Sequence, residues 1–494
     1  MSRARATSAL VALGLVALAA TMVWRAERLR ATAPLPAVVA ADAVDGARAA
    51  RRLGEAIRFR TVTHQDPAQD ELGEWQRLHD WLASTYPATH VALRRELVDG
   101  RSLLYTWPGS DPALPPILLM AHQDVVPVSP GTEGDWTEPP FSGALKDGFV
   151  WGRGAVDDKG SLVALFEAAE SLAAAGFAPR RTVLLAFGHN EEVLGSGAKA
   201  IAALLRERGL KPAFVLDEGM VIVEDHPVTK APVALIGVAE KGYATLRVTA
   251  TAPGGHSSMP PPQTAVATLA AAVLAITGSP FPFDYSGPAA EMMEALAPRA
   301  PFAIRLAVGN AWLFEPLLER QIAATPSGAA LLHTTMAPTM LEGSPKENVL
   351  PQVATARINF RIRPRDDSAA VMARAQAAVA GLPVTLEWER PPNEPTPVSS
   401  TGSEAWKLLV ELAGEASGAP VAPALVLGGT DSRVFAGWAE DVYRFQPLRL
   451  RLDELGMVHG TNERMSVANL DRVAEFYRRL IERASGLAAS PLLP

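Results

Sequence analysis

The stretch Ile117-Leu118-Leu119-Met120-Ala121-His122 is an uninterrupted apolar run that ends on a histidine. Such a run is typical of a strand buried on both faces of a sheet. Two more runs have the same form: 182–187 precedes Glu192, and 214–216 precedes Asp217. Because ligands converge at the carboxyl ends of strands in an open α/β sheet, we expect His122, Glu192 and Asp217 to meet in one crevice.

Helix and strand signals alternate around these runs. Helices are predicted at 44–58, 72–84 and 161–175, the last between the His122 and Glu192 strands. The alternation continues to about residue 238. It predicts an α/β catalytic domain with a mostly parallel sheet, formed first by residues 42–238.

The pattern changes near residue 239. A second group of strands and helices is expected at 243–251, 263–276, 354–363, 368–380 and 384–388. Two strand-helix-strand passages predict a small α+β domain of ferredoxin-like type. Residues 392–488 return to the first pattern, so 239–391 is predicted to be a lid domain inserted into the catalytic domain.

Within the inserted domain, residues 280–330 are rich in Pro, Phe, Leu and Trp. The segment is too long and too apolar for a bare loop, so we expect helices there. The sequence leaves two interpretations open: the segment accommodates an acyl chain, or it buries itself against the lid.

Composition narrows the classes of function. The chain has 494 residues, enough for two globular domains. Its net charge of −7 and the lack of a basic stripe argue against nucleic acid as a partner. It has no cysteine, so any metal must be held by histidine and carboxylate.

Residues 1–30 form a separate segment. The uncharged stretch 6–24 is long enough to cross a bilayer as a helix and longer than a typical signal-peptide core, which predicts a single-pass membrane anchor. Arginines flank it on both sides, at Arg3, Arg5, Arg25, Arg28 and Arg30. They discriminate weakly between the two orientations. We expect the catalytic domain outside the cytoplasm, and secretion after signal cleavage is the alternative.

Carboxylates accompany the strand ends. In His122-Gln123-Asp124 the acid can accept the second ring N–H of the histidine, as happens beside metal-bound imidazoles. Adjacent acids such as Glu191 and Glu192 are ordinarily solvated, but a dizinc site needs one ligand carboxylate beside one free general base. Asp157 and Asp158 begin a helix, and N-capping would suffice to explain Asp158. Together, the imidazoles and carboxylates of five residues form a set of the kind that holds two zinc ions. These residues are His122, Asp157, Glu192, Asp217 and His459.

Several motifs resemble the dizinc aminoacylase and carboxypeptidase metallopeptidases. They lie at 121–128, 157–160, 190–192, 216–219 and 458–463. Residues 135–143 and 429–433, with the apolar insertion, are similar to the branch of carboxypeptidase S and N-fatty-acyl-amino-acid synthase/hydrolase. The resemblance extends from about residue 54 to 484.

The resemblance implies two Zn²⁺ ions per chain and a role for each residue of the motifs. His122 and Asp217 would hold one zinc and Glu192 and His459 the other, with Asp157 bridging them. Asp124 would orient His122, and Glu191 would take a proton from the bridging water and deliver it to the leaving amine. A cis peptide bond between Asp157 and Asp158 is also expected.

The resemblance further assigns residues of the lid. His256, in a Gly-rich turn, would stabilise the oxyanion, in several relatives across a homodimer. Arg361 would pair with the substrate carboxylate, although an outward-facing strand arginine is an equal interpretation. Asn348 is a candidate for polar contacts on the lid side, and Thr430 and Arg433 are candidates for the pocket lining.

These expectations converge on a membrane-anchored hydrolase of amide bonds next to a free carboxylate. The substrate would be a small molecule, either a short peptide cleaved at its C-terminal bond or an N-acyl amino acid. The alternative is a non-catalytic protein that binds such molecules. Glu191 beside a complete ligand set favours the enzyme, because binding alone requires no general base.

Overall fold

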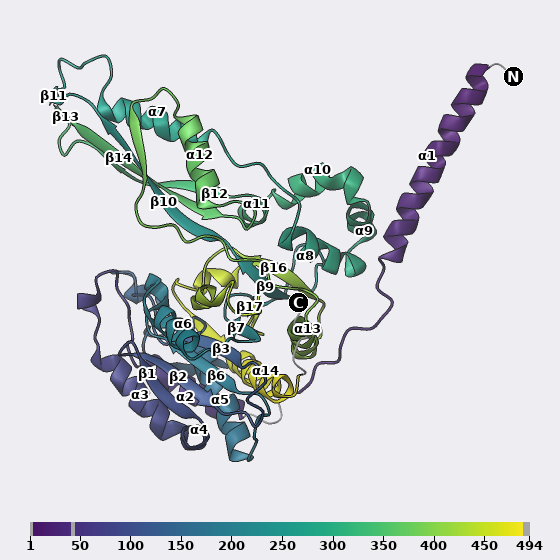
Figure 1. Ribbon diagram of the computed structural model, residues 1–494, viewed down its shortest axis with the longest axis vertical. Helices are drawn as coiled ribbons and strands as arrows, with labels where there is room; N and C mark the ends of the chain where they lie inside the picture. Colours follow the sequence, from purple (N-terminus) through teal and green to yellow (C-terminus); the bar gives the residue numbers. More distant parts are fainter. Residues whose placement is uncertain (1–2, 41–44, 488–494) are drawn as a thin grey trace.

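The computed structural model describes residues 3–40 and 45–487 (Figure 1). The expected boundaries at residues 1, 42 and 488 lie outside these ranges. A ten-stranded sheet has the order β1-β2-β6-β3-β7-β17-β9-β8-β18, and β16 lies beside β9. Its strands are β1 (Arg94–Val98), β2 (Ser102–Trp107), β3 (Ile117–His122), β6 (Val183–Gly188), β7 (Phe214–Asp217), β8 (Ile222–Val223), β9 (Val233–Glu240), β16 (Val421–Val426), β17 (Asp441–Arg444) and β18 (Arg449–Leu450).

The centre of this sheet is parallel, which confirms the predicted fold class. β3 pairs in parallel with both β6 and β7, and β17 with β7. Antiparallel pairs occur toward the edges, for example between β1 and β2. All six residues of β3 and of β6 are buried, as their unbroken apolar runs predict.

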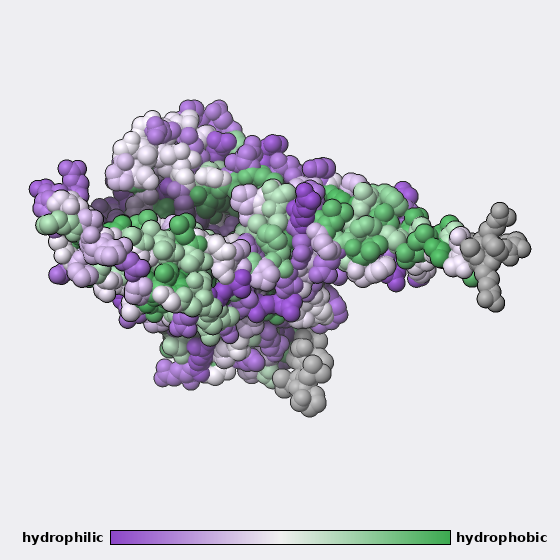
Figure 2. Space-filling model, turned by 90° about the horizontal axis from the view of Figure 1, so that it is seen from above, coloured by the Kyte–Doolittle hydropathy of each residue, from purple (hydrophilic) through white to green (hydrophobic). Residues whose placement is uncertain are grey.

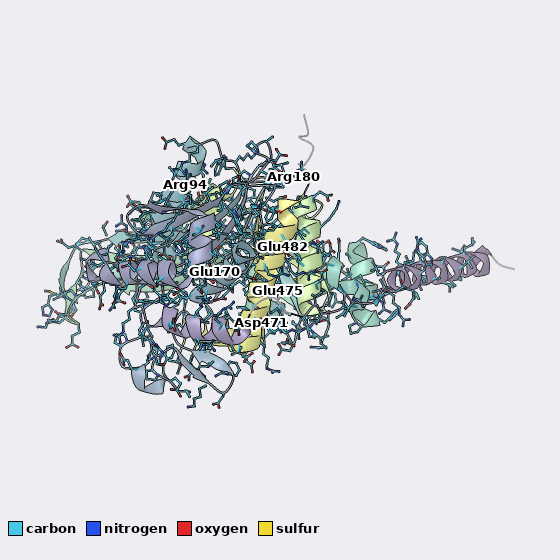
Figure 3. All side chains as sticks on the ribbon, turned by 90° about the horizontal axis from the view of Figure 1, so that it is seen from below. Arg94, Glu170, Arg180, Asp471, Glu475 and Glu482 are labelled. Atoms are coloured by element: carbon cyan, nitrogen blue, oxygen red, sulfur yellow. The ribbon has the colours of Figure 1, made fainter. Side chains whose placement is uncertain are left out.

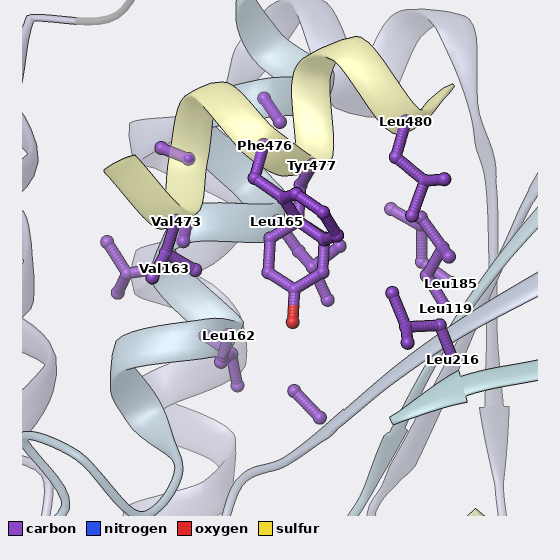
Figure 4. Packing of buried hydrophobic residues seen from close by; sticks show 14 of the residues in the cluster. Leu119, Leu162, Val163, Leu165, Leu185, Leu216, Val473, Phe476, Tyr477 and Leu480 are labelled. Carbon is purple, nitrogen blue, oxygen red and sulfur yellow. The ribbon is translucent and has the colours of Figure 1, made fainter. Parts of the chain in front are cut away.

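Helices cover both faces of the sheet. One face carries α2 (Gly46–Ile57), α3 (Gly73–Thr85), α4 (Pro87–Ala92), α5 (Lys159–Ala174), α13 (Glu404–Ser417) and α14 (Val467–Ser485). The other carries α6 (Gly197–Glu207). Figure 4 shows the inner face of α14, where Val473, Phe476 and Leu480 pack toward α5 and the strands. The outer side of α14 is charged, with Glu475 and Glu482 both paired to Arg478 (Figure 3).

A second sheet is antiparallel, with the order β12-β14-β10-β15. Its strands are β10 (Gly242–Thr251), β12 (Thr335–Glu342), β14 (Val353–Ile362) and β15 (Val384–Trp388), and α7 (Ala265–Thr277) and α12 (Ser368–Ala378) share its core. This strand-helix-strand-strand-helix-strand succession is the ferredoxin-like arrangement. A small ribbon of β11 (Gly255–His256) and β13 (Val349–Leu350) lies at the far end of this unit (Figure 1).

Residues 280–330 contain helices, as expected. They are α8 (Pro288–Leu296), α9 (Phe302–Gly309) and α10 (Ala311–Ile322), followed by α11 (Pro326–Leu332). The buried side of this group packs on β9 and β16 of the larger sheet, through residues such as Leu235 and Ala424. These helices therefore pack mainly on the larger sheet, whereas Phe281, just before them, lies in the core of the antiparallel sheet. The N-terminal helix α1 (Arg3–Arg28) projects from the molecule (Figure 1).

A three-stranded sheet joins two loops beside the larger sheet. It consists of β4 (Ala144–Lys146), β5 (Phe149–Trp151) and β19 (Arg464–Ser466), with β5 in the middle. The loop that follows β5 contains Asp157, and the loop that precedes β19 contains His459. The pairing of β5 with β19 thus holds two segments about 300 residues apart in the sequence next to each other.

Candidate metal centre

The ends of three adjacent parallel strands place polar side chains at one edge of the sheet. His122 is the last residue of β3, Glu191 and Glu192 follow β6 in a 3-10 turn, and Glu218 follows β7. Since β6, β3 and β7 are neighbours, these side chains converge, as the sequence predicts for His122 and Glu192.

The two imidazoles flank one carboxylate. His122 Nε2 lies 2.9 Å from Oδ1 of Asp157, and His459 Nε2 lies 3.0 Å from Oδ2 of the same side chain. Glu218 Oε1 is 3.2 Å from His122 Nε2, and Glu192 Oε2 is 3.0 Å from His459 Nε2. Ligand atoms about 2.0 Å from a tetrahedral zinc stand roughly 3.3 Å apart, so these spacings fit metal coordination.

The structure does not bring Asp217, an expected ligand, against either imidazole. Its Oδ2 accepts the backbone N–H of Ser432 at 2.8 Å, and among the described residues it makes no hydrogen bond or ion pair with either imidazole. Glu218 lies against His122 in its place. Successive side chains at the end of a strand point in opposite directions, so these two adjacent acids cannot both face the crevice.

The centre carries an excess of negative charge. Burial raises the pKa of Glu218 well above its ordinary value, and repulsion from Asp157 and Asp158 adds to the effect. Burial would lower the pKa of His122, but Glu218 and the other carboxylates raise it well above the usual value. Glu192 Oε1 is buried without a hydrogen-bond partner. A buried, unpaired carboxylate oxygen in such a cluster is what a cation would satisfy, so the donor set fits metal.

Asp124 holds two parts of the centre together. Its Oδ1 accepts the backbone N–H of Glu191 at 3.0 Å, and its Oδ2 accepts that of Glu192 at 3.2 Å. The same carboxylate lies 3.4 Å from His122 Nδ1, which is also 3.0 Å from the Asp124 carbonyl oxygen. Thr63 donates to Oδ2 at 2.7 Å. Asp124 thus fixes the imidazole and the Glu191 turn at once.

Asp158 does not cap the helix that it begins. No side-chain cap bond is present at the start of α5. Instead Asp158 Oδ1 accepts from Gln446 Nε2 at 2.8 Å, and its Oδ2 accepts the backbone N–H of His122 at 3.3 Å. The peptide bond between Asp157 and Asp158 is cis, as expected from the resemblance.

Glu463 is a site residue to which the sequence assigned no role. Its fully buried carboxylate accepts the backbone N–H groups of Val156 at 2.8 Å and Asp157 at 3.1 Å. Arg153 Nη1 donates to the same carboxylate at 2.8 Å. Glu463 lies four residues after His459, and this closeness to a predicted ligand could have marked it as a site residue. The partners of Glu463, however, lie more than 300 residues earlier in the sequence.

Three of the expected substrate-binding residues gather near the junction of the two units. Thr430 is buried and donates to Glu240 Oε1 at 2.7 Å. Arg433 Nη2 donates to the carbonyl of Glu394 at 3.1 Å. Burial and repulsion from Arg433 lower the pKa of Arg361, whose guanidinium stacks 4.7 Å from the Tyr243 ring. In the described ranges, no carboxylate forms an ion pair with Arg361.

His256 and Asn348 lie elsewhere. Both belong to the β11–β13 region at the far end of the lid (Figure 1), where the N–H of Ser257 donates to the Asn348 carbonyl at 3.2 Å. His256 is exposed, and its Nδ1 accepts the backbone N–H of Ser258 at 3.1 Å. The structure therefore does not bring these two residues to the centre within one chain.

A profile of the peptidase family M20/M25/M40 matches residues 118–483. The chain belongs to this family. It is accordingly a metal-dependent amidohydrolase, as the sequence predicted.

Relatives fall in the expected branch. The human N-fatty-acyl-amino acid synthase/hydrolase PM20D1 is 39% identical over 437 residues, which cover 87% of this chain and 86% of the relative. Carboxypeptidase S of Saccharomyces cerevisiae is 30% identical, covering 87% of this chain and 83% of the relative.

Solved structures share the fold at low sequence identity. An M20 metallo-carboxypeptidase from Sulfolobus solfataricus aligns with a TM-score of 0.65 at 17% identity, covering 89% of this chain and 99% of the other. Human carnosine dipeptidase 1 aligns with a TM-score of 0.63 at 16% identity, covering 90% and 97%.

Proposed function

We propose that this chain hydrolyses amide bonds that stand next to a free carboxylate in small molecules. The observation that carries the proposal is the placement of His122 and His459 on the two oxygens of Asp157, with Glu191 beside them. His122 and Glu218 would hold one zinc ion, and His459 and Glu192 would hold the other. Asp157 would hold both ions. Two such ions would polarise the scissile carbonyl and lower the pKa of a water molecule.

Glu191 is the proton carrier in this proposal. It is buried and makes no ion pair with either histidine, whereas its neighbour Glu192 contacts His459. Burial raises the pKa of Glu191 well above its ordinary value, and repulsion from Glu218 and Asp431 acts in the same direction. A buried carboxylate that contacts neither imidazole can accept a proton from water and return it to a leaving amine.

The substrate carboxylate is assigned to Arg361 and Arg433. Burial, together with repulsion from Arg433, lowers the pKa of Arg361, and Arg361 has no acidic partner among the described residues. An anionic ligand would relieve this repulsion, and guanidinium forks bind carboxylates with two parallel hydrogen bonds. Arg361 would therefore supply the preference for a free carboxylate.

The names of the relatives point to two substrate classes. PM20D1 is named for N-fatty-acyl amino acids and carboxypeptidase S for peptides. We favour N-acyl amino acids for this chain, because 39% identity to the former exceeds 30% to the latter. The preference is tested by comparing kcat/KM for N-acyl amino acids of increasing chain length with that for blocked dipeptides.

The N-terminal helix would anchor the enzyme. Among the described residues, Leu10–Arg28 is the one helical span that is long and apolar enough to cross a membrane. Only 6% of this span is buried inside the protein. Retention in the membrane after alkaline washing of cells supports an anchor, and recovery of a shortened chain from the medium supports cleavage and secretion.

A Glu191→Gln variant tests the proposed chemistry. It should keep the metal, because Glu191 contacts neither imidazole, and should lose roughly 100- to 10,000-fold in kcat. Glu404→Gln, an exposed residue paired with Lys407 on α13, is the matched control. Wild-type protein that holds zinc but turns over no amide in a broad panel would instead identify a binding protein.

A further inference from the structure

The insertion in the lid unit docks on the N-terminal helix. Asn310 Nδ2 donates to the carbonyl of Met22 at 3.1 Å, and Arg305 Nε donates to that of Ala26 at 3.3 Å. Arg305 also forms a 3.2 Å ion pair with Glu27. Because residue numbers in α9 rise as those in α1 fall, α9 runs antiparallel along the last two turns of α1 (Figure 1).

The other side of this α9–α10 hairpin exposes large apolar side chains to solvent, together with Glu315 and Arg320 of α10. Trp312 is 61% exposed, Leu317 55%, Leu313 46% and Phe302 42%. The first three belong to α10, which begins directly after Asn310. The buried residues of the hairpin, such as Val308 and Leu318, already face the larger sheet. The exposed side chains are therefore not needed for the core.

The helix α1, on which α9 docks, is itself apolar and exposed. Residues Leu10 to Trp24 of α1 include eight large apolar side chains that are 40% exposed or more, and Figure 2 shows the projecting helix as hydrophobic along its length. Trp24 is 55% exposed, and Arg28 stacks on its ring at 4.5 Å. Tryptophan beside arginine at the end of an apolar span is typical of a membrane-water interface.

We propose that the platform formed by α9 and α10 lies on the lipid bilayer that α1 crosses, with Trp312, Leu313 and Leu317 inserted among the acyl chains. The proposal rests on the proposed anchor. The α9–α10 junction stands at the level of Met22, nearer the middle of the span than Arg25 and Arg28. Exposed side chains at that level would meet the headgroup and acyl boundary, where amphipathic helices insert roughly 5–10 Å.

The platform would fix the enzyme relative to the membrane. A single span leaves a domain free to tilt, but α9 is joined to α1 by three polar contacts and to β9 and β16 by the core beneath α8. Two contacts with the bilayer, α1 and α10, define an orientation. The catalytic unit would then stand at a constant height above the lipid surface.

The chain contains no cysteine, which permits a direct test in the full-length protein. Leu313→Cys and Leu317→Cys are labelled with an environment-sensitive fluorophore in nanodiscs that contain lipids with nitroxide-bearing acyl chains. Val16→Cys reports on the anchor, and Leu274→Cys, 71% exposed on α7, reports on a surface facing water. All four positions are exposed, so folding is preserved, and unchanged hydrolytic activity confirms it.

The proposal expects roughly twofold or greater quenching by the nitroxide at positions 313, 317 and 16, and little at 274. Quenching at 16 alone would overturn the platform while leaving the anchor intact. The absence of quenching at all of the first three would reject both. Protection of 313 and 317 from aqueous iodide without nitroxide quenching would show that a protein covers this face, which also overturns the proposal.

Discussion

The carboxylate of Glu463 accepts the backbone N–H of Asp157 at 3.1 Å, and so connects the loop of one histidine to the carboxylate that both histidines flank. The same side chain receives the N–H of Val156 and faces the Arg153 guanidinium. These contacts fix the position of the Asp157 backbone relative to the two histidines. The Glu463 side chain thus positions the carboxylate that both histidines contact.

Glu463→Gln should weaken zinc binding and stability together. The amide would place an N–H donor against other donors and leave Arg153 without a buried counter-charge, which costs about 3–5 kcal/mol. Loss of such a supporting contact lowers metal affinity about 10- to 100-fold. Competition with a chromophoric chelator and unfolding of the metal-free protein measure the two effects. Glu482→Gln, at the outer side of α14, is the control, and unchanged zinc affinity would limit Glu463 to a structural role.

The pair Asp217 and Glu218 gives a sharper test of the ligand set. Glu218→Gln should reduce bound zinc from about two ions per chain to about one, because His122 then keeps only Asp157, which His459 also contacts, as a carboxylate partner. Asp217→Asn should retain both ions, because an amide oxygen can still accept the Ser432 N–H. Elemental analysis of gel-filtered protein decides. Loss of zinc from the Asp217 variant alone would restore the original assignment.

The sequence predicts which strand ends and loops form this centre better than it predicts the individual contacts within it. Buried parallel strands leave long apolar runs, so their ends are readable, and His122, Asp157, Glu192 and His459 do meet. The adjacent acids Asp217 and Glu218 at the end of β7 carry no signal that separates them, because one residue of register decides which faces the crevice. Contacts such as that of Glu463 depend on a loop more than 300 residues away.

The lid was less predictable for a related reason. The strands β10 and β14 alternate between buried and half-buried positions and are evident from the sequence. The strand β12 lacks this signal, since most of its residues are exposed and Pro338 adjoins a register shift. Its position depends on pairing with β14, which only the folded chain supplies.

Arg361 should control the preference for a free carboxylate. Arg361→Met should lower kcat/KM for N-acyl amino acids roughly 10- to 100-fold, the value of one or two charged hydrogen bonds. The same variant should barely change the rate on substrates whose carboxylate is amidated. Arg247→Met, on the exposed side of β10, is the control. Equal losses on acids and amides would remove this role from Arg361.

The buried Lys241 predicts a pH dependence of stability. Its Nζ donates to the carbonyls of Ala330 at 3.0 Å and His333 at 2.8 Å, and burial, with Arg363 and Arg361 nearby, lowers its pKa to about 7. The unfolded chain keeps this proton to about pH 10.4, so between these values it binds more protons than the folded chain. Stability must then rise with pH across this window.

Lys241→Met should remove that rise. Relative to the variant, the free energy of unfolding of the wild type should rise by up to about 1.4 kcal/mol per pH unit between pH 7 and pH 10. The wild type should compare least favourably with the variant below pH 7. Denaturant unfolding of both proteins across this range measures the difference. The control is Lys407→Met, since Lys407 is exposed and paired with Glu404. The stability of this variant should change with pH in parallel with that of the wild type. Parallel curves for Lys241→Met would show that its pKa is not lowered.

The exposed position of His256 at the lid end predicts complementation between chains. If His256 completes the centre of a second copy, Glu191→Gln and His256→Ala proteins are each inactive alone. Mixed in equal amounts, half of the dimers contain one of each chain, and one of their two centres has both residues. The mixture should therefore regain about a quarter of wild-type activity. A His256 that reaches the centre of its own chain by lid closure would give no recovery, because no centre in the mixture would then contain both groups.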